Sequence, residues 1–414
     1  MTIKIDCPEC NKPYRLPDNA AGKKFRCKEC DTAIAVPLDD VEDLEYAEED
    51  ERPIRRKPAA KKSKGKKSKS TSIWSTPLPW IGIGGGGFLL IVLVTVVVTA
   101  GKRPATNTIG STPTIVSTGP ADGLFPVAQV PIPSFPELGA PRILQPSGVR
   151  MWFVQMPPSA TPGHSMAFRV YLPPNDAPDH SIPCVLVAPA GSNLLVGNDM
   201  DADDYHAETL PYAEAGMAVI FYSLDGGLAD LQNASDPQLK MAYNKFRAAY
   251  AGVVNGRNAL EYALTKMPQV DPKKIYTAGH SSAGTVSLLI AEHEPRLAGS
   301  IAYAPCTDVE ARLAEVSGSW QVRTLLPDLL NFLKQSSPKT HTAQVGCPVF
   351  VFHANDDSNV NVSESRDFVQ RLKTAGKRVD FQTVPTGNHY DSMVQQGIPA
   401  AIAWLKRDPA ANSQ

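Results

Sequence analysis

Residues 275–285 constrain the fold more than any other stretch of this sequence. A short apolar run ending at Ala278 leads into Gly-His-Ser-Ser-Ala-Gly at 279–284 and then into a helical pattern. The pattern predicts a strand that turns sharply into a helix and makes a serine oxygen protrude at the turn. Small residues flank the serine because the first helical turn passes close to the strand. The stretch therefore indicates a nucleophile elbow with Ser281 at its tip.

The same residues allow two other interpretations. A serine after a glycine turn also caps an ordinary helix. In addition, Gly284 follows Ala283, so a shift of one position would make Ser282 the nucleophile. We favour Ser281, because Gly279 directly ends the apolar strand.

The region around this elbow alternates apolar runs with amphipathic stretches. Such alternation is typical of an α/β fold in which helices flank a mostly parallel sheet. The first two strands are expected to be antiparallel. The predicted strands cover residues 151–154, 168–172, 184–188, 218–222, 274–278, 299–304, 349–352 and 379–384. The sequence also predicts a long helix over 237–267, an irregular insertion over 306–346 and a closing helix over 398–406.

Two loops that follow the last strands carry groups able to activate a serine. The first contains Asp356 and Asp357, and the second reads Gly-Asn-His with His389 at its end. An imidazole takes the proton of the hydroxyl, and a carboxylate fixes the tautomer of the imidazole. We predict Ser281, Asp357 and His389 as the catalytic residues, since this chain order is typical of such a sheet. Asp356 is the alternative acid.

Residues 150–407 resemble an α/β-hydrolase of the dienelactone hydrolase and prolyl-oligopeptidase-like group. The acid loop of that group reads Gly-x-x-Asp-x-x-Val, and residues 354–360 match its aspartate and valine but begin with alanine. The Gly-Asn-His loop fits the group's histidine loop. The resemblance implies a Ser-His-Asp hydrolase that needs no cofactor in this domain.

The oxyanion loop departs most from that group. Relatives often carry His-Gly-Gly after the third strand, where this chain has Pro-Ala-Gly at 189–191. The first backbone donor is expected to be the amide of Ser282, the residue after the nucleophile. The second donor could come from Ala190, Gly191 or Ser192, and we assign it to Gly191.

The other histidines and cysteines of this region receive no catalytic role. His280, His293 and His353 are interpreted as structural or exposed, because only His389 lies where the base belongs. The region also contains Cys184, Cys306 and Cys347. Cys184 and Cys347 border apolar strands and are interpreted as buried thiols, with a 306–347 disulfide as the alternative.

Four further cysteines occur near the N-terminus as two Cys-x2-Cys pairs. These are Cys7, Cys10, Cys27 and Cys30. Two such pairs supply the four thiolates of a tetrahedral zinc site, which favours a structural zinc ribbon over 1–38 rather than disulfides or a redox pair. Residues 3–37 resemble the ribbons that begin many bacterial membrane-anchored proteins. Basic residues lie in this segment, but without interleaved aromatics we do not expect a nucleic-acid partner.

Residues 39–148 predict a tether, a membrane span and a spacer. An acidic block over 39–51 and a basic block over 52–69 indicate a disordered tether over 39–79. The uncharged apolar run over 80–100 is long enough for one transmembrane helix. Its basic N-terminal flank predicts a cytoplasmic N-terminus and an extracytoplasmic catalytic domain. Residues 101–148, rich in Pro, Thr and Ser, predict a semi-extended spacer before a catalytic domain over 149–408.

The sequence as a whole predicts a single-pass membrane-anchored serine hydrolase that cleaves carboxylic esters or related acyl bonds. A prolyl-oligopeptidase-like peptidase acting on short peptides ranks second, because no propeller-like repeat precedes the domain in this chain. A third hypothesis is a silent hydrolase fold that binds a ligand and is coupled to the cytoplasmic ribbon. This hypothesis stays open because alanines stand at positions 283 and 354, where the elbow and acid-loop motifs have glycine.

Overall fold

The structure of the protein is a computed structural model. It describes residues 2–6, 13–17, 24–26, 33–35, 123–200, 205–228, 231 and 233–407. The chain divides into two units, Met1–Pro79 and Trp80–Gln414, which we treat separately.

Several predicted features lie outside the described residues. They are the four zinc-ribbon cysteines Cys7, Cys10, Cys27 and Cys30, the tether over 39–79, the membrane span over 80–100 and the spacer over 101–122. In the part of the chain that is described, no helix has both the length and the apolar character needed to cross a bilayer. Nor do those residues contain a cluster of three or more His, Cys, Asp or Glu side chains that could hold a metal ion.

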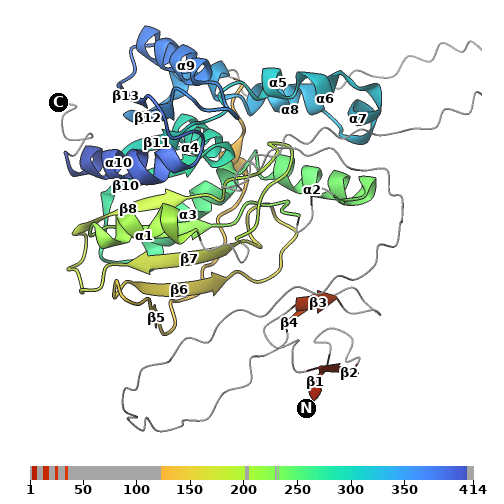
Figure 1. Ribbon diagram of the computed structural model, residues 1–414, viewed down its shortest axis with the longest axis vertical. Coiled ribbons are helices and arrows are strands. Elements are labelled where there is room, and N and C mark those ends of the chain that lie inside the picture. Colours follow the sequence, from red (N-terminus) through yellow and green to blue (C-terminus); the bar gives the residue numbers. More distant parts are fainter. Residues whose placement is uncertain are drawn as a thin grey trace, which may run out of the picture. The chain divides into compact units, whose positions relative to one another are not determined.

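The N-terminal unit contains two antiparallel strand pairs (Figure 1). β1 (Thr2–Asp6) pairs with β2 (Pro13–Pro17), and β3 (Lys24–Arg26) pairs with β4 (Ala33–Ala35). In the sequence, each Cys-x2-Cys pair falls between the two strands of one hairpin.

The C-terminal unit is built on a nine-stranded sheet with the order β13-β12-β11-β10-β8-β9-β7-β6-β5. The strands from β13 to β9 are parallel, and β7, β6 and β5 continue the sheet in antiparallel fashion. Their bounds are β5 Arg142–Ile143, β6 Arg150–Gln155, β7 Ala167–Leu172, β8 Ile182–Val187, β9 Ala218–Tyr222, β10 Val270–His280, β11 Gly299–Tyr303, β12 Val349–Ala354 and β13 Val379–Val384. The predicted mixed sheet and its antiparallel opening strands are confirmed.

Helices cover both faces of this sheet (Figure 1). Along β10, Ile275 belongs to one apolar cluster while Tyr276 and Ala278 belong to the other, because successive side chains of a strand point to opposite faces. The first cluster includes residues of α2 (Asp236–Ala248), α3 (Val253–Lys266), α4 (Ser282–His293) and α9 (Val362–Thr374). The second includes residues of α1 (His206–Glu214) and α10 (Ile398–Lys406). Short 3-10 segments cover Val127–Gln129, Pro338–Thr340 and Thr342–Gln344, and a π-helical turn covers Met393–Gly397.

The prediction of one long helix over 237–267 is wrong. The chain forms α2 and α3, separated by Tyr250, Ala251 and Gly252, all of which have positive φ. A Cβ on Gly252 would lie 2.8 Å from Leu224 Cδ2. The close packing at this glycine, together with its φ of 86°, turns the chain between two helices that both pack on the core.

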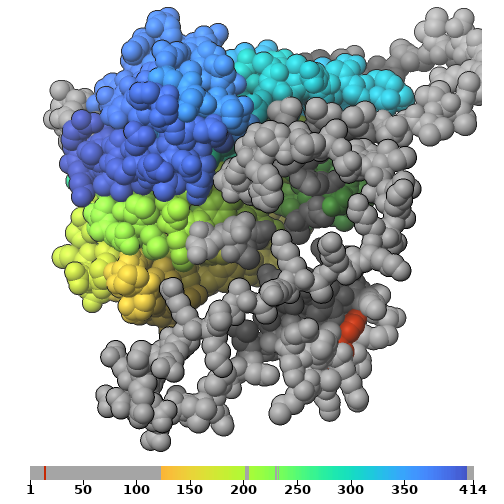
Figure 2. All heavy atoms as spheres, viewed as in Figure 1, coloured from red at the N-terminus to blue at the C-terminus, as the bar shows by residue number. Residues whose placement is uncertain are grey.

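The insertion over 306–346 is helical rather than irregular. It forms α5 (Val309–Arg312), α6 (Ala314–Gly318), α7 (Trp320–Leu325) and α8 (Leu329–Gln335), which Figure 1 labels. The atoms of this segment are the cyan spheres of Figure 2. α8 is fixed to the core by Leu329, Phe332 and Leu333, which are buried. Cys184, Cys306 and Cys347 are free, buried thiols, so the alternative 306–347 disulfide is not formed.

The prediction of a spacer is wrong for residues 123–148. β5 pairs with β6, and residues 123–138, which we call the strap, pack against the sheet's first cluster. Phe125 and Val127 are only 7% and 9% exposed. The buried Arg257 guanidinium donates hydrogen bonds to the carbonyls of Val127 and Val130. Apolar residues spaced among the prolines therefore make the strap part of the fold.

Phe125 anchors the strap to the core through its ring and its amide. Its ring stacks on Tyr250 and His293 at centroid distances of 5.2 and 5.6 Å, and its amide donates to His293 Nε2 at 3.0 Å. His293 is thus structural, as predicted.

We expect Phe125→Ala to lower the free energy of unfolding by about 3 kcal/mol, because it leaves a cavity under the strap. Urea unfolding followed by fluorescence measures this change. Ile132→Ala is the matched control on the same strap, since Ile132 is 52% exposed and its loss should cost less than about 0.5 kcal/mol. Equal effects of the two variants would show that the strap does not contribute to the core.

Candidate active site

The elbow forms where β10 passes into α4. Ser281 has φ 54° and ψ −121°, a strained conformation for a residue with a side chain. A Cβ on Gly279 would lie 2.2 Å from the Ala283 carbonyl oxygen, so no side chain fits there. The Ser281 amide donates to the Tyr303 carbonyl at 2.8 Å, which ties the turn to the neighbouring strand. This geometry matches the predicted strand-turn-helix.

The two adjacent serines have different surroundings. The hydroxyl of Ser282 accepts a hydrogen bond from the Ser192 amide at 3.1 Å. Ser282 is buried and is the first residue of α4. Ser281 is half-buried and occupies the strained tip. The local geometry therefore favours Ser281 over the one-residue shift.

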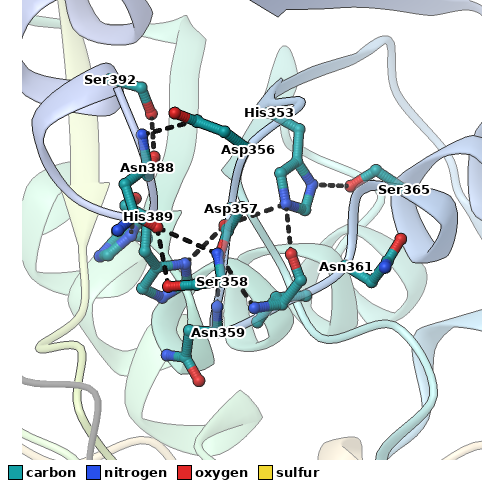
Figure 3. Close-up of polar contacts among 12 residues, drawn as sticks. His353, Asp356, Asp357, Ser358, Asn359, Asn361, Ser365, Asn388, His389 and Ser392 are labelled. Carbon is teal, nitrogen blue, oxygen red and sulfur yellow. Dashed lines mark hydrogen bonds and ion pairs between the residues drawn. The ribbon is translucent and has the colours of Figure 1, made fainter. Parts of the chain in front are cut away.

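The two predicted acids accept hydrogen bonds from different groups (Figure 3). Asp357 Oδ2 lies 2.7 Å from His389 Nδ1 and accepts its hydrogen. Asp356 instead accepts hydrogen bonds from the backbone amides of Gly387 and Asn388, at 3.2 and 2.8 Å. Asp356 thus holds the backbone of the histidine loop, and only Asp357 reaches the imidazole.

His389 has one ring nitrogen engaged and one free. Nδ1 faces Asp357, while Nε2 is buried without a hydrogen-bond partner among the described residues. Such a nitrogen can accept a proton. The His389 ring lies 4.5 Å from the ring of His280, centroid to centroid, and His280 directly precedes Ser281. The structure therefore brings Asp357 and His389 together beside the elbow.

His280 was expected to be structural or exposed, and it is buried against the site. Its Nε2 donates to the His389 carbonyl oxygen at 2.9 Å. Burial, with the nearby His389 ring as the next cause, lowers the pKa of His280 to about 3. This imidazole therefore stays neutral and holds the backbone of His389.

The charge of Asp357 is stabilised by its hydrogen bonds. Burial by itself raises the pKa of this carboxyl group, but hydrogen bonds from His353 and His389 outweigh burial and leave the pKa well below its usual range. Asp357 thus stays ionised, which is the state that an orienting acid requires.

His353 is the residue that the sequence reasoning missed. It was interpreted as structural or exposed, yet its Nε2 lies 3.0 Å from the same Oδ2 of Asp357 that accepts from His389. The available signal was its position at the end of a strand, four residues before the acid.

The predicted oxyanion loop follows β8. Asn198 Nδ2 and the Tyr205 hydroxyl both donate to the Ala190 carbonyl oxygen. The Gly191 N–H belongs to the same trans peptide and points the opposite way. The Ser192 amide is engaged by Ser282 Oγ, which removes Ser192 from the three alternative donors.

The first predicted donor lies at a helix N-terminus. Ser282 is the first residue of α4, and the first amides of a helix have no acceptor within it. Gly191 has φ 87°, a conformation that favours glycine. The amides of Ser282 and Gly191 are therefore both candidates for holding an oxyanion.

A cavity of about 760 Å³ opens near the carboxyl ends of β6 and β9. The loop at 159–165, residues 223–228 and α2 line it, with Asp199 at one side. Ser281, Asp357 and His389 are not among its lining residues.

Comparison with known proteins agrees with this geometry. Residues 245–407, which include the elbow and both downstream loops, match the prolyl oligopeptidase family. No curated protein sequence matches the chain.

Solved structures share the architecture. An acetyl xylan esterase from Paenibacillus sp. R4 is 13% identical with a TM-score of 0.51, over 68% of this chain and 90% of the esterase. An acylaminoacyl peptidase from Pyrococcus horikoshii is 14% identical with a TM-score of 0.50, over 63% of this chain and 42% of the peptidase. The fold is that of an α/β-hydrolase. The family match supports a serine hydrolase, and we refer to residues 123–407 as the hydrolase domain.

Proposed function

We propose that the protein is a serine hydrolase that cleaves carboxylic esters or related acyl bonds through Ser281, His389 and Asp357. The observation that carries this proposal is the pairing of Asp357 with His389 Nδ1 at 2.7 Å, which leaves the buried Nε2 free. The same imidazole lies 4.5 Å from the ring of His280, the residue that precedes the strained Ser281. Neither the pairing nor the strain is needed for a helix that is merely capped by serine.

The reaction begins when Ser281 Oγ attacks the acyl carbon and its proton passes to His389 Nε2. Asp357 stabilises the imidazolium, and the amides of Ser282 and Gly191 hold the oxyanion. His389 then gives the proton to the leaving oxygen, which departs and leaves an acyl-Ser281. Water then attacks the acyl carbon and gives its proton to His389, which passes a proton to the departing Ser281 Oγ as the carboxylic acid is released.

Peptides are the second candidate substrates, because the matched family is named for a peptidase. We place esters first, since residues 1–148 contain no propeller-like repeat of the kind that restricts access to short peptides. No cofactor has a role in this mechanism. Small acyl esters are therefore the first substrates to test, with short peptides beside them.

A fluorophosphonate probe tests the nucleophile. We expect the wild type to be labelled and Ser281→Ala to lose labelling entirely, because the phosphonyl bond forms with that oxygen. Ser282→Ala is the matched control and should label within about tenfold of the wild type, since it loses one hydrogen bond to Ser192. A folded wild type that takes no label would instead favour a catalytically silent binding domain.

The two aspartates give a second test. Asp357→Asn should lower kcat on a chromogenic aryl ester about 10⁴-fold, because the amide favours the wrong histidine tautomer. Asp356→Asn should cost at most about 10²-fold, through a displaced histidine loop. The acid assignment fails if Asp356→Asn is the more damaging change.

We also propose that residues 1–38 form a zinc ribbon and that residues 80–100 anchor the chain in a membrane. The support is the Cys-x2-Cys spacing, its place between paired strands, and the uncharged run. A localisation follows, with the ribbon cytoplasmic and the hydrolase domain outside. Ester or peptide substrates would then be met outside the membrane, and nucleic acid is not an expected partner.

The purified full chain should contain about one zinc ion, which Cys27→Ser should remove by taking one of the four thiolates. Elemental analysis measures this content. Ser substitution of the buried Cys184 is the control and should leave zinc in place. A folded, zinc-free wild type contradicts the ribbon, and failure of added protease to release the hydrolase domain from intact cells contradicts the topology.

A further inference from the structure

We propose that His353 is a positioning residue of the active site, which holds the Asp357 carboxylate so that its Oδ2 faces His389. The inference rests on the proposed function, since it assigns a role in that reaction. It concerns a group that does not touch the substrate.

His353 lies at the end of β12, with its side chain fully buried. Its Nε2 is 3.0 Å from Asp357 Oδ2 and 2.9 Å from the Val360 carbonyl oxygen. Both of these oxygens are acceptors, so Nε2 must carry the hydrogen and donate to them. The opposite nitrogen, Nδ1, is 2.7 Å from the Ser365 hydroxyl on α9. The ring is therefore held at both ends.

The Asp357 carboxylate is held by four hydrogen bonds (Figure 3). Oδ1 accepts from the amides of Asn359 and Val360 at 2.8 and 2.9 Å. Oδ2 accepts from the two imidazoles, His389 and His353. An ionised carboxylate accepts about four hydrogen bonds, so its capacity is used completely.

His353 is the donor that fixes Oδ2 from the side away from His389. The backbone amides hold only Oδ1, and without His353 the other oxygen would be held by the catalytic imidazole alone. His389 must itself change protonation in the reaction, so it cannot serve as a constant anchor. A buried donor that takes no part in proton transfer supplies that anchor.

The alternative is that the imidazole ring only fills space between β12 and α9. Two substitutions separate this packing role from the positioning role. His353→Phe keeps a planar ring and removes the donor. His353→Gln loses the ring but retains an amide N–H at a similar reach. A positioning role predicts that Gln is better than Phe, and a packing role predicts the opposite.

The experiment is steady-state kinetics of the full chain on an aryl ester across pH. We expect His353→Phe to lower kcat about 10- to 100-fold with little change in KM, and His353→Gln to recover most of the loss. The acid limb of kcat/KM should move to higher pH in His353→Phe. The reason is that a carboxylate with one donor fewer raises the proton affinity of the Asp357–His389 pair.

The control is His341→Phe, which changes another buried histidine that is not part of the site. It should leave kcat and the acid limb at wild-type values. His280, the other imidazole beside the pair, stays neutral across this pH range because its pKa is lowered to about 3. Wild-type kcat and acid limb in His353→Phe would overturn the proposal, as would a Gln variant no better than Phe.

Proton NMR separates this inference from the proposed function. The hydrogen shared by His389 Nδ1 and Asp357 should give a low-field resonance in the wild type. If the wild type turns over no ester, the proposed function fails, but the resonance should still shift in His353→Phe and not in His341→Phe. A resonance unaffected by His353→Phe would overturn the positioning role by itself.

Discussion

The close approach of α4 to β10 is the constraint on which the site depends. Only a hydrogen fits at Gly279, because a Cβ there would lie 2.2 Å from the Ala283 carbonyl oxygen. The chain must therefore turn within a few residues, and the strain of that turn falls on Ser281 at φ 54°. Ala278, before the turn, belongs to one apolar cluster, and Ala283, after it, belongs to the other. Packing on both faces of the sheet therefore holds the strained turn in place.

The parallel strands bring the remaining groups to the same place. β12 runs parallel beside β11, and β13 runs parallel beside β12, so the loops that follow them open at the edge of the sheet where β10 leads into the serine turn. Backbone contacts then set the loops relative to each other. Asp356 holds the amides of the histidine loop, and His280 holds the His389 carbonyl. The geometry of the candidate site thus comes from side chains that bind backbone as much as from the three proposed catalytic groups.

Burial and hydrogen bonding have opposite effects on the pKa of the Asp357 carboxyl group. Burial disfavours an ionised Asp357, and donors from two histidines reverse that effect. For His280, burial outweighs the hydrogen bond to the His389 carbonyl and the nearby Asp357 charge, so the pKa is lowered and the imidazole remains neutral. Two imidazoles close to one another can therefore have different tasks, one as a proton acceptor and one as a fixed backbone clamp.

The sequence by itself determined the alternating pattern of the sheet, the elbow and the two downstream loops, because these depend on local periodicity and on small residues at a turn. It left open the choice between Asp356 and Asp357, since neighbouring carboxylates look alike until their directions are known. Only the tertiary structure separated them. It also showed that His353, four residues before Asp357, turns its imidazole toward that carboxylate, because the direction of a side chain where a strand enters a loop is not fixed by the sequence pattern. The strap over 123–138 and the break at Gly252 also depend on tertiary contacts. Prolines and helical spacing describe the chain only locally. The strap is held by Arg257, and Gly252 packs against Leu224, and both partners are distant in sequence.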